Sequence, residues 1–392
     1  MNASNERPSR LGALLDPGRP FGVSPVVAAS AVWAVAFIVM VSLRFTDTIH
    51  GKSYAYFEGA GLNWINQEPL YDMSTFEGFQ YFPQAAIVFA PFAALGFPWG
   101  NVLWRVLMWT LLLLGVRRLS AELVPTRRDE AFLIATCLAI GPAVGPLGNG
   151  QANLLLAALG LHVAADVAQK RWWRAAVIAV FGVAMKPLFA VLALLVSALY
   201  RPLGWRIAVG LAVAFFVPWL VADSAYVVEQ YAALPAKLRL GAKPIPMFED
   251  MRGIAITLGW TMPHDVATAL RIVAALATLG ITLVARRRVR EPYAVTLVVG
   301  LAAAYLMVFN PRTQSTSYAI PGAVVAVLAA LYWFEGRKRA LLAAVGVQVA
   351  FTLNHNYIPP IELWLRPLAA IALGLFLTRE SFRPPTRYRS TS

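Results

Sequence analysis

The feature that most constrains this chain is a series of apolar runs from residue 26 to residue 377, interrupted by short polar or basic loops. The 392 residues are 59% hydrophobic and only 14% charged, and the mean hydropathy is +0.61. Soluble domains carry about a quarter charged residues. Because the shortage of charge extends along almost the whole length, we predict an all-α polytopic membrane protein, in which the bilayer replaces a single soluble core.

The apolar runs predict a bundle of about 12 transmembrane helices, since a helix needs about 20 apolar residues to cross a bilayer. Residues 85–97 are too few to cross and contain Pro91, so we expect them to dip into the membrane from the outer side. The expected crossings are 26–43, 99–116, 132–147, 154–167, 175–185, 188–200, 207–221, 266–285, 294–309, 318–334, 340–353 and 361–377.

Arginine and lysine residues concentrate in the short loops between these runs, as at 117–118, 286–290 and 337–339. The positive-inside rule puts such loops on the cytoplasmic side, so we expect both termini there and the protein in the cell (plasma) membrane. The net charge of +14 follows from this topology. No separate basic patch indicates nucleic-acid binding.

We treat 1–392 as a single integral membrane domain, without an internal repeat. Its parts are a cytoplasmic N-terminal segment 1–24, a first outer loop 45–84, a second outer loop 222–264 and a cytoplasmic basic tail 379–392. Most acidic residues lie in the outer loops and outer helix ends, which predicts that the chemistry faces the extracytoplasmic side.

The first outer loop is long, polar and rich in aromatic residues, so it offers a membrane enzyme a place for water, carboxylates and a soluble substrate. Within it, residues 53–65 have apolar side chains at helical spacing. We expect an amphipathic helix along the outer membrane surface, with Glu58 beside its apolar face. That face consists of Tyr54, Phe57, Gly61, Leu62 and Ile65.

The same loop begins a set of motifs that resembles a known family. The run YFEGAGLNWINQEPLYD at 56–72, then QYFPQAAIVFAPFAAL at 80–95 and Leu103-Trp104, resembles the start of glycosyltransferase family 87. Further similar motifs follow in order: GNGQANLLLAAL at 148–159, KRWWRAA at 170–176, AMKPLF at 184–189, EDMRGIAITLG at 249–259 and FNPRTQSTSYAIPG at 309–322. The resemblance implies a GT-C-like bundle and a hexose donor linked to polyprenyl phosphate, with mannose the commonest sugar.

The resemblance also implies a general base, an aspartate at the start of the first outer helix. In this chain that position falls at about Ser53, and serine cannot take the role. Glu58 or Asp47 could supply the carboxylate instead, and Asp72, the second outer loop or no base at all remain alternatives. A base must come within about 3 Å of the acceptor hydroxyl, or act through one water.

A lipid-phosphate donor implies cations near the outer headgroups. Lys186 is the first candidate, because an ionisable residue between two apolar runs indicates function; the alternative is that it reaches to the interface. Arg312 is the next, since arginine binds phosphate oxygens in bidentate fashion, and Arg252 is the third. With protein cations to stabilise the leaving phosphate, we expect no cofactor. The scattered histidines do not match metal-ligand spacing, so we expect no metal.

Several polar residues are candidates for binding sugar or acceptor. Asn149, Gln151 and Asn153 have amides that either bond sugar hydroxyls or cap a helix. Tyr71 and Asp72 follow the first helix. His355 faces outward and is either an acceptor-site residue or a plain surface histidine.

The favoured interpretation is an inverting membrane hexosyltransferase that moves a hexose from a polyprenyl-phosphate-linked sugar to a glycolipid or glycan acceptor, with membrane lipids as further partners. A lipid or polyol transporter or flippase is the rival. Transporters usually show internal repeats and broken helices at the midplane, whereas the polar residues here gather at one face. A catalytically inactive relative is a third possibility, because of Ser53.

Overall fold

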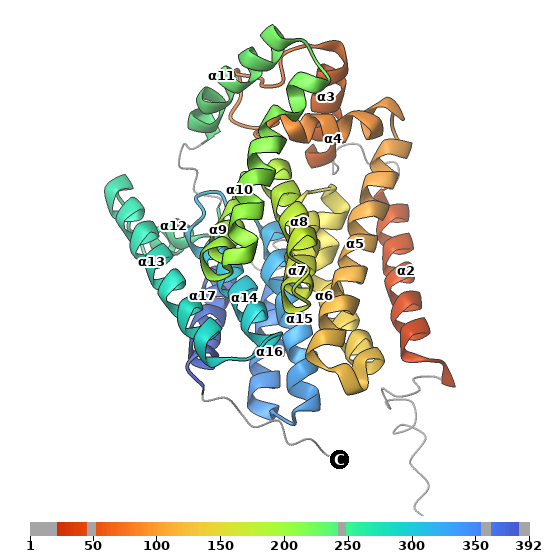
Figure 1. Ribbon diagram of the computed structural model, residues 1–392, viewed down its shortest axis with the longest axis vertical. Helices are drawn as coiled ribbons and strands as arrows, with labels where there is room; N and C mark the ends of the chain where they lie inside the picture. Colours follow the sequence, from red (N-terminus) through yellow and green to blue (C-terminus); the bar gives the residue numbers. More distant parts are fainter. Residues whose placement is uncertain (1–21, 45–51, 242–247, 354–361, 384–392) are drawn as a thin grey trace, which may run out of the picture.

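The computed structural model describes residues 22–44, 52–241, 248–353 and 362–383. Within these ranges the chain is helical and contains no strand, which confirms the predicted all-α class. Two layers are visible in Figure 1. A bundle of roughly parallel and antiparallel helices fills the lower part, and α3 (Lys52–Asn66), α4 (Pro83–Ala94) and α11 (Ser224–Gly241) lie across its upper end. We call this the capped end.

The bundle consists of apolar helices that run between the capped end and the opposite end. They are α2 (Pro25–Arg44), α5 (Trp99–Leu123), α6 (Arg128–Asn149), α7 (Asn153–Ala168), α8 (Trp172–Met185), α9 (Ala190–Leu199), α10 (Arg201–Phe216), α13 (His264–Arg288), α14 (Tyr293–Phe309), α15 (Ala319–Phe334), α16 (Lys338–Thr352) and α17 (Glu362–Ser381). Three shorter elements also matter here: α12 (Met251–Thr257) and the 3₁₀ turns η3 (Pro187–Phe189) and η5 (Ser315–Tyr318).

The centre of the bundle is formed by helices that are apolar on every side. Nearly all of α7, α14 and α15 is buried, and these helices are rich in Ala, Gly and Val. Small residues let helix backbones approach closely, which supplies packing energy where no hydrophobic force acts between helices in lipid. These helices hold the polar residues at their upper ends in fixed positions.

The outer helices indicate the surrounding solvent. The apolar windows of α2, α10 and α13 are only 17%, 17% and 11% buried inside the protein. Large exposed apolar surfaces are not stable in water, but they are in a bilayer. Six of the described helices are long and apolar enough to cross a membrane, which confirms a polytopic membrane protein. The count of about 12 crossings stays a prediction, because several apolar helices are shorter.

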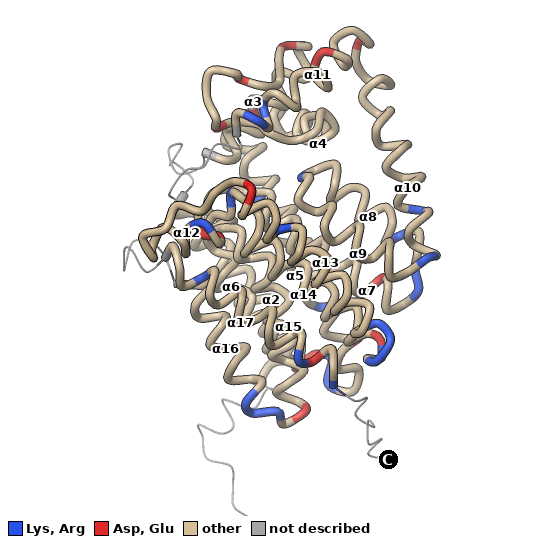
Figure 2. The backbone as a smooth tube through the Cα atoms, turned by 90° about the vertical axis from the view of Figure 1, so that its left-hand side faces the viewer, with Lys and Arg blue, Asp and Glu red and all other residues tan. Residues whose placement is uncertain are grey.

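The two ends of the bundle differ in charge. Figure 2 shows acidic positions around α11 and the neighbouring loops, whereas the opposite end has loops rich in Lys and Arg. That end includes 117–118, 286–290 and 337–339. We call it the basic end. The acidic residues around α11 and the basic loops therefore lie at opposite ends of the bundle.

The structure adds detail to both outer loops. The segment 53–65 is helical as predicted, but Leu62 and Ile65 are 42% and 50% exposed, whereas Ala60 and Trp64 are buried. The buried stripe turns toward α4, which crosses α3 at Gly61, where a side chain would lie 2.8 Å from Ala93 Cβ. In the second outer loop, α11 and α12 are helices that the sequence did not predict, because their polar residues obscure the apolar spacing.

Candidate functional site at the capped end

A polar cluster lies where the bundle meets the cap. Lys186 follows the last residue of α8, and its Nζ donates a hydrogen bond to Oδ1 of Asn153, the first residue of α7, at 2.6 Å. Nζ also lies 5.7 Å from the centre of the Tyr81 ring. Pro187 stops α8 here, since proline cannot continue a helix. Because α8 ends at Met185, Lys186 lies after the end of α8 and beside the start of α7, and not within a helix.

Amide and hydroxyl groups extend this cluster. Asn153 Nδ2 donates to Gln151 Oε1 at 3.0 Å and to Ser317 Oγ at 3.2 Å, and Gln151 Nε2 donates to Gln314 Oε1 at 3.0 Å. Thr316 Oγ1 donates to the same Gln151 oxygen. The predicted pair Gln151 and Asn153 therefore joins a network across the 314–317 turn, which the sequence did not single out.

Arg312 lies beside the same cluster, in the connection between α14 and η5. Its Nη1 donates to Gln80 Oε1 at 2.7 Å, and its guanidinium lies 5.7 Å from the Phe76 ring and 5.4 Å from the Phe248 ring. Gln80 and Tyr81 are adjacent, so the two predicted cations contact neighbouring residues of one loop. Burial lowers the pKa of Arg312, opposed by Tyr81 and Glu77, but an arginine stays charged.

The loop that presents Gln80 and Tyr81 is held by aromatic packing. The Tyr81 ring lies 5.5 Å from Phe57 of α3 and 5.4 Å from Phe79. Tyr71 is buried, and its hydroxyl donates to the Tyr81 carbonyl at 2.8 Å. Tyr71, predicted to bind sugar or acceptor, therefore supports the loop by its position. We call Lys186, Arg312, Tyr81, Gln80, Gln151 and Asn153 the Lys186–Arg312 site.

A buried lysine fixes the preceding part of this loop. Lys237 of α11 is fully buried, and its Nζ donates to the carbonyl oxygens of Asp72, Thr75 and Glu77 at 2.5, 2.8 and 2.6 Å. An ammonium has three N–H donors, so each one has an acceptor. Burial lowers the pKa of Lys237, while the charge of Asp72 raises it.

Two more side chains of α11 form hydrogen bonds with the backbone of this loop. Gln230 Oε1 accepts a hydrogen bond from the Leu70 backbone N–H at 2.9 Å, and the Tyr226 hydroxyl donates to the Glu68 carbonyl at 2.9 Å. Tyr226, Gln230 and Lys237 lie at i, i+4 and i+11, which is one face of a helix. The second outer loop therefore sets the shape of the first.

The predicted carboxylates have different surroundings. Glu58 is half-buried on α3 and has no hydrogen bond or ion pair within the part of the chain that the structure describes. Burial raises its pKa. Asp72 is exposed; its Oδ1 accepts from Ser74 N and Oγ at 2.8 and 2.6 Å, which lowers its pKa and fixes a turn. Asp47 lies outside the described residues.

A carboxylate that the sequence did not single out lies nearer to Arg312. Glu77 is exposed, its Oε2 accepts from the Tyr56 hydroxyl at 2.7 Å, and its charge raises the pKa of Arg312 against the larger effect of burial. The sequence signal that could have indicated Glu77 is its position in FEGFQYFPQ, three residues before Gln80.

The other predicted residues do not join the cluster. Arg252 belongs to α12, where its Nη2 lies 3.5 Å from His264 Nδ1 and its backbone N–H donates to Asp250. Asn149 is the last residue of α6, and its side chain has no polar contact within the described ranges. His355 lies outside the described residues.

An apolar groove opens beside the site. It has a volume of about 420 Å³ and is lined by α4, α8 and α10. At one end are Gln84 and Ala184, three residues after Tyr81 and two before Lys186; at the other are Trp173 and Arg206. The lining between them is aliphatic and aromatic: Ile87, Val88, Ala176, Val177, Val180, Phe181, Val209, Gly210, Val213, Ala214 and Val217.

Comparison with known proteins identifies the family. The sequence pattern of glycosyltransferase family 87 matches residues 79–311, which include Gln80, Tyr81, Asn153 and Lys186 as well as the groove. The match ends just before Arg312 and begins after Glu58. No curated protein matches the chain. Because the matched residues make up more than half of the chain, this membrane protein belongs to glycosyltransferase family 87 and is a glycosyltransferase.

Proposed function

We propose that the protein transfers a hexose, mannose in the first instance, from a polyprenyl phosphate to a glycolipid or glycan acceptor at the Lys186–Arg312 site. The observation that carries this proposal is that the apolar groove has Ala184 and Gln84 in its lining, two residues before Lys186 and three residues after Tyr81, which lies beside Lys186. A ligand with a hydrocarbon chain followed directly by a phosphate matches that order of surfaces.

The groove suits one part of such a donor. Along α8 it extends from Trp173 to Ala184, a rise of about 16 Å at 1.5 Å per residue. This is about half of the hydrocarbon thickness of a bilayer, which is about 30 Å. A prenyl chain in the groove would therefore be enclosed over about half of that thickness, up to the residues that precede Lys186.

The cations suit the phosphate. Lys186 Nζ donates one hydrogen bond within the protein, to Asn153, and an ammonium has three donors. Arg312 donates to Gln80 through Nη1, and its guanidinium has five N–H groups. Both residues thus retain donors for phosphate oxygens. Positive charges placed where a leaving phosphate gains charge lower the barrier to bond breaking.

The transfer itself needs a base on the acceptor side. In the proposed step a carboxylate takes the proton of the acceptor hydroxyl, the acceptor oxygen bonds to the anomeric carbon, and the bond from that carbon to the phosphate oxygen breaks. The phosphate leaves with the electron pair, and the configuration inverts. Glu58, whose pKa is raised by burial and which has no hydrogen bond or ion pair among the described residues, and Glu77, whose charge acts on Arg312, are the two described candidates; Asp47 is a further one.

The charge separation supports an orientation. Loops rich in Lys and Arg face the cytoplasm in polytopic proteins, so the basic end would be cytoplasmic and the capped end extracytoplasmic in the plasma membrane. Polyprenyl-linked sugars and a soluble or lipid acceptor would then meet outside.

The test is transfer of labelled sugar by purified protein in lipid nanodiscs, with mannosyl and glucosyl polyprenyl phosphates as donors. We expect Lys186→Met and Arg312→Gln to reduce kcat/KM by about 10²-fold or more, the loss typical of a donor at a developing charge. Arg287→Gln, an exposed change at the basic end, is the control. Full activity of both site variants would exclude the site, and absence of transfer with every donor would indicate an inactive relative.

A further inference from the structure

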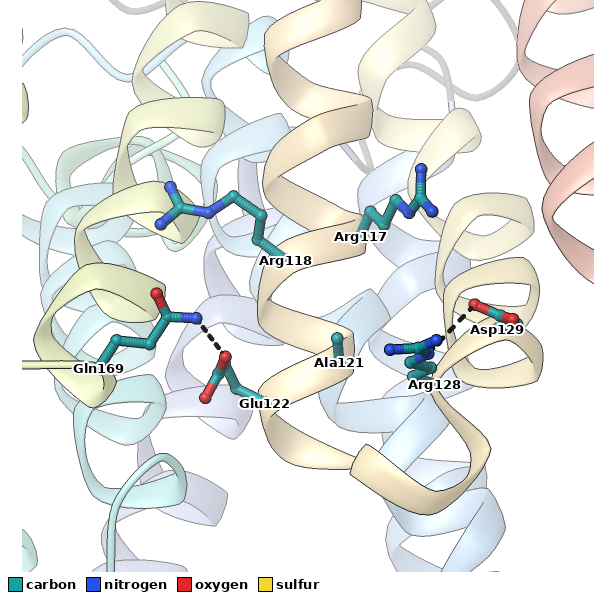
Figure 3. Close-up of a pocket in the computed structure, with 7 residues that line it drawn as sticks. All are labelled: Arg117, Arg118, Ala121, Glu122, Arg128, Asp129 and Gln169. Atoms are coloured by element: carbon teal, nitrogen blue, oxygen red, sulfur yellow. Dashed lines mark hydrogen bonds and ion pairs between the residues drawn. The ribbon is translucent and has the colours of Figure 1, made fainter.

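A second polar cavity lies at the basic end, on the far side of the bundle from the Lys186–Arg312 site. It has a volume of about 300 Å³ and is bordered by the last turns of α5, the start of α6 and the residue after α7. Figure 3 shows its side chains arranged around the small Ala121. They are Arg117, Arg118, Glu122, Arg128, Asp129 and Gln169.

The cavity contains charges of both signs, some of which are already paired. Arg118 forms an ion pair with the fully buried Asp166, and its Nη1 lies 2.9 Å from His162 Nδ1. Gln169 Nε2 donates to Glu122 Oε1. These contacts account for Arg118 and for one oxygen of Glu122, and they fix both side chains in the wall.

The remaining groups are weakly engaged. The Arg128 Nε to Asp129 Oδ1 distance is 3.9 Å, and both side chains are exposed. Arg117 is exposed and packs over the Phe132 ring at 5.9 Å, with no ion pair among the described residues. Arg117 and Arg128 thus offer guanidinium donors, while Glu122 Oε2 and Asp129 offer carboxylate acceptors within one cavity.

We propose that this cavity binds the headgroup of an aminophospholipid, a phosphate diester linked to a primary ammonium. The phosphate would accept hydrogen bonds from Arg117 and Arg128 on one side of Ala121, and the ammonium would donate to Glu122 on the other side (Figure 3). A purely anionic ligand would meet the two carboxylates and a purely cationic one would meet the arginines, whereas this headgroup matches both signs.

The primary amine and the lipid source each follow from an observation. A quaternary ammonium has no N–H to donate, so the carboxylates favour a primary amine. The cavity lies among the basic loops, at the end of α5, a helix that is long and apolar enough to cross a membrane. Basic pockets between transmembrane helices at such a level bind lipid headgroups. The inference is independent of the sugar-transfer proposal.

The test is binding of phosphatidylethanolamine, phosphatidylcholine and phosphatidylglycerol to the purified full chain, by native mass spectrometry and thermal unfolding in mixed micelles. We expect phosphatidylethanolamine to bind at least tenfold more tightly than the other two. Arg117→Gln should weaken all three phospholipids, because it removes the phosphate contact. Glu122→Gln should remove the preference for phosphatidylethanolamine over phosphatidylcholine while the protein stays folded.

Arg287→Gln, exposed in another loop of the basic end, is the matched control and should change none of these affinities. Equal binding of the three lipids, or a preference for phosphatidylglycerol, would overturn the proposal. Soluble phosphoethanolamine is the second ligand tested, and stabilisation by it alone would overturn the membrane source. Sugar transfer is measured separately, so its failure does not bear on this site.

Discussion

The least expected residue in the cap is Lys237. A buried charge is costly unless hydrogen bonds replace its hydration, and here three backbone carbonyls do so. Hydrogen bonds to charged groups contribute more than neutral ones, about 1.5–3 kcal/mol each. The lysine therefore both requires and stabilises the path of residues 72–77.

We predict that Lys237→Met loosens this loop more than it unfolds the bundle, because the lost contacts all belong to the cap. The expected destabilisation of the loop is about 3 kcal/mol, from carbonyls left without a partner. Limited proteolysis should cut the variant within 72–78 much faster than the wild type. Arg239→Met, exposed on the same helix, should leave the cleavage rate unchanged; equal rates for the two variants would contradict the role of Lys237.

Glu58 gives a prediction on pH. Its pKa is raised by burial, so on lowering the pH it takes up a proton earlier than an ordinary glutamate. If it is the base, kcat/KM is complete above this raised pKa and falls as the pH drops through it. Glu58→Gln should lower kcat/KM by about 10²–10⁴-fold and remove the acid limb. A limb that persists in Glu58→Gln and disappears in Glu77→Gln would transfer the role to Glu77.

At the scale of elements, the groove between α4, α8 and α10 makes the most specific prediction. Ala184→Phe adds a ring where the groove approaches Lys186. We expect KM for long polyprenyl donors to rise at least tenfold, while transfer from a donor with a short, water-soluble chain is unchanged. Leu194→Phe, on the exposed surface of α9, is the control. Equal effects on short and long donors would argue against a chain-binding groove.

Helices of the bundle and α3 of the cap could be predicted from the sequence, whereas α11 of the cap could not. Apolar runs predict α5, α7 and α14, because side chains that contact either the protein core or lipid are apolar. In the cap, α11 buries Gln230 and Lys237 and exposes Val228, so the spacing of its apolar residues does not predict which face of the helix is buried. The sequence places Lys186 and Arg312 at the same end of the bundle, and their role in binding stays a prediction. The contacts of Gln314, Thr316 and Glu77 could not be predicted, because they join distant segments.

At the scale of the whole molecule, the orientation in the membrane can be tested with little engineering, because Cys137 is the single cysteine of the sequence. In a Cys137→Ala background, we predict that Glu229→Cys on α11 reacts with a membrane-impermeant maleimide on intact cells. Arg287→Cys should react only after permeabilisation. Both positions are exposed. The reverse labelling pattern would invert the proposed topology and move the site to the cytoplasm.

The hydrogen bonds between α11 and the first outer loop determine which substitutions this loop can tolerate in evolution. The hydrogen bonds that Tyr226, Gln230 and Lys237 make with Glu68, Leu70, Asp72, Thr75 and Glu77 all go to main-chain atoms. Every residue has the backbone carbonyl that accepts these bonds, and every residue except proline has the backbone N–H that Leu70 donates. Exposed side chains such as that of Glu68 can therefore vary while the course of the loop is kept, whereas the buried Leu70, Tyr71 and Phe79 cannot. If this loop contacts the acceptor, as proposed, substitutions at its exposed positions could change the acceptor without altering the backbone contacts with α11.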